Sequence, residues 1–254
     1  MPSHASSAFQ PPVIVLVRPQ LAENIGATAR AMVNFGGRDL RLVAPREFDQ
    51  ALAERMACDG RDIFLRRQVY PDLASAPADC AYALATSRRL RRVKIPPLDP
   101  RAAAERLAAL PPSSRKALVF GSEQAGLTNE ELFLCDAAST IPVTEQGSLN
   151  LAQAVVVYCY EWFTASRQAR PLPYTPERPA THEEKQRIYD LLSSLLLAAD
   201  YQPRSRFPEF LRRVKLLFEN RLLTHREQRI LLKVLRYLEK GIAVKPPGRS
   251  PGHH

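Results

Sequence analysis

Four segments of the chain carry side chains whose types and spacing could bind a ligand. They are Asn24-Ile-Gly-Ala-Thr-Ala-Arg30, Thr86-Ser-Arg-Arg-Leu-Arg-Arg-Val-Lys94, Gly121-Ser-Glu-Gln-Ala-Gly-Leu127 and Ile141-Pro-Val-Thr-Glu-Gln-Gly-Ser-Leu-Asn150. The small residues of the first segment allow another backbone to approach closely. The second segment has five basic side chains, which are suited to phosphate contacts.

The residue types missing between positions 13 and 168, where the four segments lie, argue against several common catalytic chemistries. None of the five histidines lies between residues 13 and 168, so a Ser-His-Asp hydrolase or a histidine-ligated zinc enzyme is excluded there. Gly121 and Gly126 have the spacing of a Walker loop, but Leu127-Thr128 stands where Lys-Ser/Thr is required. No Gly-x-Gly-x-x-Gly follows a predicted strand, so a nucleoside-triphosphate or nicotinamide enzyme is not favoured.

Each segment alone also has a purely structural interpretation. The candidate side chains are Asn24, Arg30, Glu123, Ser148 and Asn150. The amides and the hydroxyl would then cap helices, and the carboxylate and guanidinium would be solvated. Gly121 and Gly126 would only form a turn, and the basic run 88–94 would be a solvated loop. No single segment assigns a function, so their joint arrangement has to decide.

The four segments follow predicted strands of an α/β fold. Apolar runs predict strands at 13–17, 39–43, 68–70, 80–85, 116–120 and 138–143. Amphipathic patterns predict helices at 25–35, 50–58, 100–109, 129–134 and 149–166, with Tyr158 interpreted as a core residue. This alternation predicts an open, mostly parallel sheet, which binds ligands at the carboxyl ends of its strands.

The composition changes after residue 168. Residues 169–180 are rich in proline and predict a linker, whereas 181–241 have a purely helical rhythm. Predicted helices begin at Thr181, Pro208 and Thr224. Residues 177–245 contain 15 basic and 9 acidic side chains, a surplus of six within a net charge of +10. A pI near 9.8 favours nucleic acid or an anionic membrane surface as partner, unless the charge serves only solubility.

The remaining features indicate a cytoplasmic protein without a metal site. No apolar stretch is long enough to span a membrane, and the N-terminus lacks the apolar stretch of a signal peptide. The four scattered cysteines lack a Cys-x-x-Cys pair, which is typical of reduced thiols. Residues 1–12 and 242–254 are predicted to be disordered.

In order and spacing, three of the segments resemble the motifs of the SPOUT methyltransferases, in the TrmH-type branch of RNA ribose 2′-O-methyltransferases. The matching stretches are Asn24-x-Gly26-x-x-x-Arg30, Phe120-Gly121-x-Glu123-x-x-Gly126-Leu127, and Ile141-Pro142 leading to Ser148-Leu149-Asn150-Leu151-Ala152. Thr86-Ser87, Thr128-Asn129-Glu130-Glu131-Leu132 and the basic helical region resemble the TrmJ group in particular. That group methylates the first nucleotide of the tRNA anticodon loop, nucleotide 32. Gly147 departs from the pattern, which has a second serine there.

The resemblance implies a methyltransferase domain over 13–168 with a deep trefoil knot in its C-terminal part, and a small helical tRNA-binding extension over 181–241. It also implies a homodimer and S-adenosylmethionine as cofactor. The cofactor would be bound by Thr86, Ser87, Arg88, Gly121, Ile141, Gly147, Ser148 and Leu149. The catalytic residues would be Arg30, Asn24, Glu123, Ser148 and Asn150, with Arg30 facing the partner subunit's cofactor. RNA would be bound by Arg30, Arg88, Arg89, Arg91, Arg92 and Lys94.

In this interpretation Arg30 binds the neighbouring phosphate and stabilises developing alkoxide charge, because a guanidinium is a poor base. Glu123, Ser148 and Asn150 would orient the ribose or the arginine. Two alternatives stay open: 2′-O-methylation of another tRNA or rRNA position, and a non-catalytic RNA-binding protein of the same fold. The intact set of catalytic candidates speaks against the second.

Overall fold

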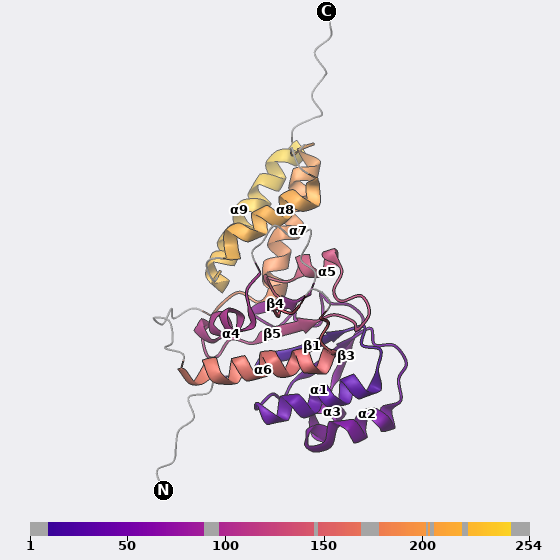
Figure 1. Cartoon of the computed structure of the whole chain (residues 1–254). Helices are drawn as coiled ribbons and strands as arrows, with labels where there is room; N and C mark the ends of the chain where they lie inside the picture. Colours follow the sequence, from indigo (N-terminus) through magenta and orange to yellow (C-terminus); the bar gives the residue numbers. More distant parts are fainter. Residues whose placement is uncertain are drawn as a thin grey trace, which may run out of the picture. The chain divides into compact units, whose positions relative to one another are not determined.

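The chain divides into two compact units, Met1–Pro176 and Glu177–His254 (Figure 1). This computed structural model describes residues 10–88, 97–144, 147–168, 178–201, 203, 206–219 and 223–244. Within those ranges, no helix combines the length and apolar character needed to cross a membrane.

Six strands form the centre of the first unit. They are β1 (Val13–Val17), β2 (Leu40–Val43), β3 (Gln68–Tyr70), β4 (Tyr82–Thr86), β5 (Lys116–Phe120) and β6 (Ala137–Ser139). Their order is β3-β2-β1-β5-β4-β6, and each pairing is parallel. The predicted α/β class is therefore confirmed. The chain moves to the other side of β1 after β3, so a switch point lies between β1 and β5, where such sheets bind ligands.

The strands are apolar on both faces because each face is covered. On one face, Val13, Val15 and Val17 join a buried cluster that includes Leu127 and Leu132. The helix on this side is α5 (Asn129–Leu134). On the other side lie α1 (Ala22–Asn34), α4 (Pro100–Ala109) and α6 (Leu151–Gln168). Figure 1 shows α1 and α6 on the side of the sheet opposite α5. This burial explains the continuous apolar runs in the sequence.

Local signals explain where most helices begin. Asp49 accepts a hydrogen bond from the backbone N–H of Leu52 and so caps α2 (Gln50–Ala57). Asp99 caps α4 in the same way, and Thr128 forms a capping box with Glu131 at the start of α5. These starts lie within a residue of the predicted ones.

The three largest differences from the sequence prediction concern the following elements of the first unit. The short helices η1 (Cys58–Gly60) and α3 (Arg61–Leu65) were not predicted, because they are too short to show a helical period. Strand β6 ends at Ser139 rather than at residue 143, since Thr140 already pairs with Leu98 beyond the sheet. The third difference is α1, which begins three residues before the predicted start.

The second unit contains α7 (His182–Ala198), α8 (Phe207–Glu219) and α9 (His225–Val244). Thr181 pairs with Glu184, and Thr224 pairs with Glu227, in capping boxes at the starts of α7 and α9. Helix α9 continues into the segment predicted as a disordered tail.

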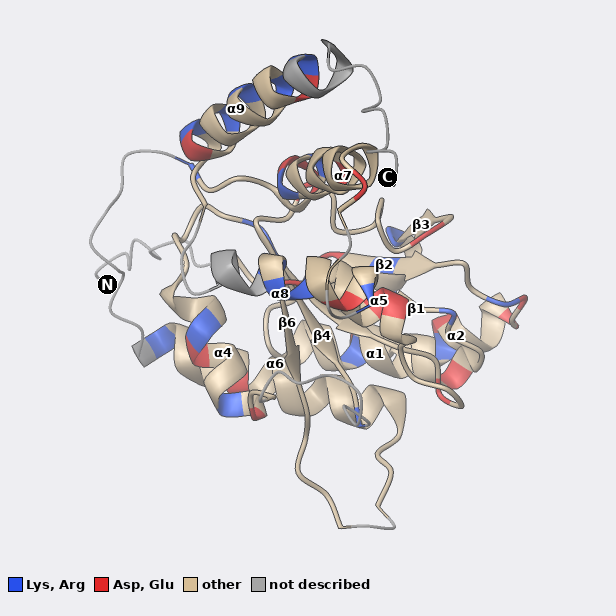
Figure 2. Cartoon of the chain, turned by 90° about the horizontal axis from the view of Figure 1, so that it is seen from above, with Lys and Arg blue, Asp and Glu red and all other residues tan. Residues whose placement is uncertain are grey.

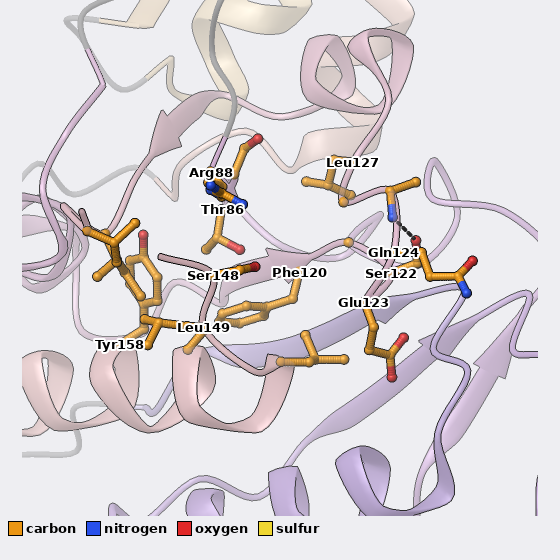
Figure 3. Close-up of a pocket in the computed structure, with 18 residues that line it drawn as sticks. Thr86, Arg88, Phe120, Ser122, Glu123, Gln124, Leu127, Ser148, Leu149 and Tyr158 are labelled. Carbon is orange, nitrogen blue, oxygen red and sulfur yellow. Dashed lines mark hydrogen bonds between the residues drawn. The ribbon is translucent and has the colours of Figure 1, made fainter. Parts of the chain in front are cut away.

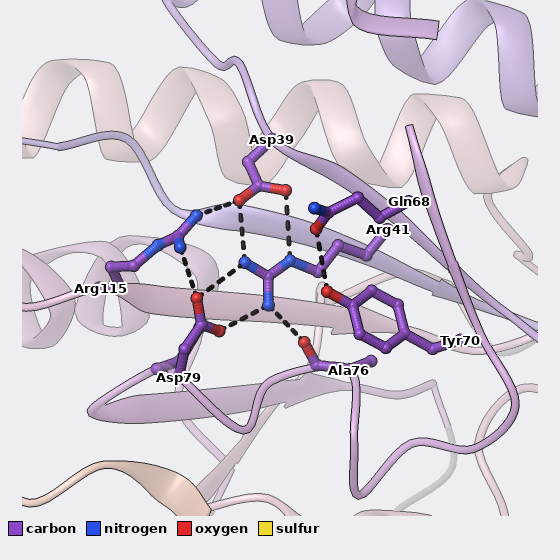
Figure 4. Close-up of polar contacts among 8 residues, drawn as sticks. Asp39, Arg41, Gln68, Tyr70, Ala76, Asp79 and Arg115 are labelled. Carbon is purple, nitrogen blue, oxygen red and sulfur yellow. Dashed lines mark hydrogen bonds and ion pairs between the residues drawn. The ribbon is translucent and has the colours of Figure 1, made fainter. Parts of the chain in front are cut away.

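A buried arginine joins three loops at the amino end of the sheet (Figure 4). Arg41 of β2 is 2% exposed and uses its guanidinium for hydrogen bonds to Asp39, Asp79 and the carbonyl of Ala76. Arg115 binds both aspartates from the other side. Burial alone would raise the pKa of Asp79, but the hydrogen bond and charge of Arg41 and the charge of Arg115 lower it.

We expect Arg41→Met to lower the free energy of unfolding by about 2–3 kcal/mol at pH 7, because two carboxylates lose their buried partner. A carboxyl with a lowered pKa contributes stability above its ordinary pKa, and this contribution is lost as the pH falls through the folded value. The loss of unfolding free energy caused by Arg41→Met should therefore become smaller below about pH 4. Urea denaturation at pH 7 and pH 3 measures it, with Arg101→Met, in an exposed ion pair, as control. An equal penalty at both pH values would contradict the interpretation.

Candidate active site

A cleft of about 190 Å³ lies at the carboxyl ends of β4, β5 and β6 (Figure 3). Most of its lining comes from three of the segments identified in the sequence, and the rest comes from the end of β5 and from α6. The lining residues are Thr86, Ser87, Arg88, Phe120, Gly121, Ser122, Glu123, Gln124, Ala125, Gly126, Leu127, Ile141, Val143, Ser148, Leu149, Leu151, Ala154 and Tyr158. Segments far apart in the chain therefore meet around one cleft, as ligand sites of open α/β sheets do.

Seven of the eight predicted cofactor residues line this cleft. The exception is Gly147, which is not among the lining residues and whose backbone N–H donates to the carbonyl of Thr144. Arg88, predicted for both cofactor and RNA, is exposed and lies over Thr86 in Figure 3. The predicted RNA-binding residues Arg89, Arg91, Arg92 and Lys94 lie outside the described residues.

The loop after β5 requires glycine at both of its ends. A Cβ on Gly121 would lie 2.1 Å from the carbonyl carbon of Gly126, so the loop closes tightly on itself only without a side chain there. Gly126 has a φ of +68°, in the left-handed region that favours glycine. This compact loop turns its backbone toward the cleft, where it can bind polar groups of a ligand.

A chain of hydrogen bonds joins the three sequence motifs next to the cleft. Asn24, 4% exposed, donates from its amide nitrogen to Glu123 at 2.9 Å and accepts from the amide of Asn150 at 2.7 Å. Asn150 also accepts from the backbone N–H groups of Ala152 and Gln153, and so caps α6. Asn24 is therefore not the helix cap that one interpretation of the sequence suggested. Its side chain is the link between the other two motifs.

Glu123 replaces a missing local cap at the start of α1. The N-cap residue Leu21 has no side-chain hydrogen bond to the helix. The carboxylate of Glu123 instead accepts from the backbone N–H groups of Gln20 and Leu21, at 3.0 and 3.2 Å. A carboxylate at a helix N-terminus satisfies unpaired donors and complements the helix dipole. In Figure 3, Glu123 points away from Thr86. We infer that it orients α1 and Asn24 rather than reacting itself.

Arg30 lies outside the cleft of its own chain. Its side chain is exposed on α1 and is not among the lining residues. It has no hydrogen bond or ion pair with another residue in the described ranges. Among the described residues the guanidinium therefore has no partner, which leaves it available to an anion from outside the chain.

Sequence reasoning missed the aromatic floor of the cleft. Tyr158, interpreted as core, packs edge-on against Phe120 with 5.6 Å between ring centroids, and both residues line the cleft. The Tyr158 hydroxyl donates to Ser139, which donates to the carbonyl of Leu98. Burial raises the pKa of Tyr158 to about 12, so the phenol is neutral. No spacing in the sequence signals this pair, because either ring alone fits a core position.

The comparisons with known proteins agree with this geometry. Residues 11–160 match the SpoU rRNA Methylase family. The chain belongs to this family. A TrmJ described as a tRNA (cytidine/uridine-2′-O-)-methyltransferase from Klebsiella pneumoniae is 34% identical over 89% of this chain and 96% of its own.

Two further relatives extend the similarity. The tRNA (cytidine/uridine/adenosine-2′-O-)-methyltransferase TrmJ of Pseudomonas aeruginosa is 41% identical over 74% of this chain and 71% of its own. The crystal structure of TrmJ from Z. mobilis is 38% identical and superposes with a TM-score of 0.77, over 90% of this chain and 99% of the other. This SpoU-family chain is a methyltransferase, and the matched region contains each of the five candidate catalytic side chains.

We expect Asn24→Asp to lower kcat/KM for methyl transfer by about tenfold to a hundredfold, because it replaces the donor facing Glu123 with a second carboxylate oxygen. Stability should fall as well, by about 2 kcal/mol. The matched control is Asn34→Asp, the same change at an exposed position of the same helix. Steady-state kinetics and thermal unfolding measure both effects. Equal activity of the two variants would show that the link between the motifs is dispensable.

Proposed function

We propose that this SpoU-family methyltransferase transfers the methyl group of S-adenosylmethionine to a ribose 2′-hydroxyl of tRNA, at nucleotide 32 of the anticodon loop. It would act as a homodimer in the cytoplasm. The observation that carries the proposal is a cleft lined by the second and third motif segments, to which Asn24 of the first motif is linked by hydrogen bonds with Glu123 and Asn150. The choice of tRNA is supported by the TrmJ relatives, whose similarity extends over both units of this chain.

The cleft fits the proposed cofactor in shape and chemistry. Phe120, Leu149 and Leu151 supply apolar surface for a flat purine, and the tight loop closed by Gly121 presents backbone groups to polar atoms. The bound cofactor would supply an electrophilic sulfonium methyl group. Thr86, Ser87 and Ser148 add side-chain hydroxyls around it.

The proposed trefoil knot is supported by the hydrogen bonds around the end of β6. On one side, the backbone N–H of Ser87 donates to the carbonyl of Ser139. On the other side, Thr140 donates to the carbonyl of Leu98. Ser87 and Leu98 thus lie on the two sides of β6, and the segment that leaves β6 begins between them. Threading of that segment through the chain between Ser87 and Leu98 would close the cofactor loops on one another.

The proposed dimer is supported by an exposed apolar surface next to Arg30. Val33 on α1 and Val156 and Tyr160 on α6 are 37%, 42% and 53% exposed. Phe35, just after α1, contacts the Tyr160 ring edge-on, which makes the surface continuous across the two helices. A self-complementary contact through this surface would bury these side chains and carry Arg30 toward the partner's cleft.

In this arrangement each candidate residue acts through position and charge. The guanidinium of Arg30 would bind the phosphate beside the target ribose and stabilise charge developing on the 2′-oxygen. Ser148 lines the cleft and would orient the ribose. Asn24 and Asn150 would hold the first and third motifs at a fixed separation. Most of the rate would then come from alignment of oxygen and methyl group.

The tRNA contacts of the helical extension are supported by one face of α9. Five exposed basic residues recur at intervals of three and four, which places them on the same side of the helix. They are Arg226, Arg229, Lys233, Arg236 and Lys240. Figure 2 shows Lys and Arg along α9. Such a row is suited to successive phosphates of an RNA backbone.

The function is tested by mapping 2′-O-methyl groups in total tRNA with and without the gene. A mark at nucleotide 32 that disappears with the gene, and returns with the wild-type chain but not with Arg30→Ala, is the expected result. Loss of a mark at another tRNA or rRNA position would replace the substrate. No change in any mark would refute the proposed activity.

Arg30→Ala should abolish turnover while leaving the dissociation constant for the cofactor nearly unchanged. Ala125→Trp, which fills the cleft from an exposed lining position, should abolish cofactor binding. If Arg30 acts on the partner's cleft, mixing the two inactive variants restores one complete site per mixed dimer, so about a quarter of wild-type activity returns. If Arg30 acts within its own chain, the mixture stays inactive. Calorimetry and a methyl-transfer assay give both readouts.

RNA affinity should fall steeply as salt rises, because binding releases counterions from phosphates. Replacing Arg229, Lys233 and Arg236 together with Gln should reduce the slope of log K against log salt by about one for each phosphate that the variant no longer binds. The matched control replaces Arg55, Arg61 and Arg66, three exposed arginines of the first unit. An RNA affinity that does not change with salt, or an equal decrease of the slope in the control variant, would argue against phosphate binding by α9.

A further inference from the structure

The loop that forms one wall of the cleft, Gly121–Leu127, is anchored at both of its ends. Near its start, Glu123 binds Gln20 and Leu21 in the connection between β1 and α1, and Asn24 in the first turn of α1. Just beyond its other end, Glu131 binds Arg18, which lies in the same connection. Two carboxylates therefore attach both ends of the wall to one short stretch of chain.

Arg18 adopts an unusual backbone conformation to make this contact. It follows β1 directly, and its backbone N–H donates to the carbonyl of Val43, the last residue of the neighbouring strand β2. Its φ is +49°, in the left-handed region that non-glycine residues rarely adopt and that costs free energy for a long side chain. Glycine would relieve this cost, so the arginine has to be explained by what its side chain does.

Glu131 has two separate tasks that can be distinguished by substitution. Its carboxylate pairs with the Arg18 guanidinium through two hydrogen bonds, the second at 2.9 Å. It also accepts from the backbone N–H of Thr128 at 2.8 Å, which completes the capping box of α5. A glutamine can fill the capping box but carries no charge for the arginine.

The pair is more than a solvated surface contact. The Glu131 side chain is 14% exposed, although that of Arg18 is 37% exposed. Burial alone would raise the pKa of Glu131, but the hydrogen bond from Arg18 and those from Thr128 lower it. A bidentate guanidinium–carboxylate pair also fixes direction, which a single charge contact does not. Neither residue lines the cleft, so any effect on a ligand must pass through the loop.

We propose that Arg18 and Glu131 are positioning residues for the cofactor, which hold the Gly121–Leu127 loop against the β1–α1 connection at the separation that S-adenosylmethionine requires. This inference rests on the assignment of the cleft to the cofactor. Leu127 transmits the position of the ion pair to the cleft, because this residue is 7% exposed, lines the cleft and directly precedes the capping box of α5. Without the pair, the far end of the wall loses its charged attachment to the β1–α1 connection.

The test compares Arg18→Gln, Arg18→Gly and Glu131→Gln with Arg61→Gln, which breaks an exposed ion pair elsewhere. We expect the first three to raise the calorimetric dissociation constant for S-adenosylhomocysteine and the KM for S-adenosylmethionine about threefold to tenfold. The kcat at saturating cofactor and the KM for RNA should stay within about twofold. The Arg18→Gln/Glu131→Gln double variant should be no worse than either single one.

Arg18→Gly separates positioning from stability. Glycine removes the backbone cost, so this variant should unfold at a higher temperature than Arg18→Gln while binding the cofactor equally weakly. Cofactor affinity that recovers together with the unfolding temperature would overturn the proposal. So would an unchanged dissociation constant in both Arg18 variants. If Ala125→Trp leaves cofactor binding intact, the assignment of the cleft to the cofactor is wrong. If Ala125→Trp weakens cofactor binding but the Arg18 variants do not, only the positioning role is refuted.

Discussion

The buried amide of Asn24 is the contact on which the arrangement of the site depends. An amide has both a donor and an acceptor, so it can satisfy the carboxylate of Glu123 and the amide of Asn150 at once. A hydroxyl is too short to do both, and a carboxylate would face Glu123 with like charge. Because these three residues come from three separate segments, one side chain determines how these segments at the carboxyl end of the sheet lie relative to each other.

That contact forms only because the surrounding backbones come unusually close. A Cβ on Gly26 would lie 2.1 Å from the carbonyl oxygen of Ala53, so α1 packs against α2 at a distance that requires glycine. Gly121 plays the same part in the loop that carries Glu123. The small residues of both motifs therefore act first on packing between backbones. The polar residues beside them occupy the positions that this packing creates.

Features encoded by neighbouring residues could be predicted from the sequence, whereas features encoded by distant ones could not. Strands β1 and β5 and helices α4 and α5 were predicted to the residue, because burial and caps leave local patterns. The start of α1 was missed since its capping carboxylate, Glu123, comes about a hundred residues later. For the same reason Asn24 could be interpreted as a cap, and the pairing of Arg18 with Glu131 left no signal.

In the proposed function, the positions of charge would leave a single copy of this chain an incomplete catalyst. The carboxylate of Glu123 beside the cleft already accepts a hydrogen bond from the backbone that leads into α1. Arg88 also lines the cleft, but it follows β4 and belongs to none of the three motifs. Arg30, the motif cation, is exposed and lies outside the lining. A methyl acceptor that becomes anionic in the transition state needs a positive group beside it. If that group is Arg30, it has to come from another copy, and the exposed Val33 and Tyr160 beside it give that copy a surface to bind.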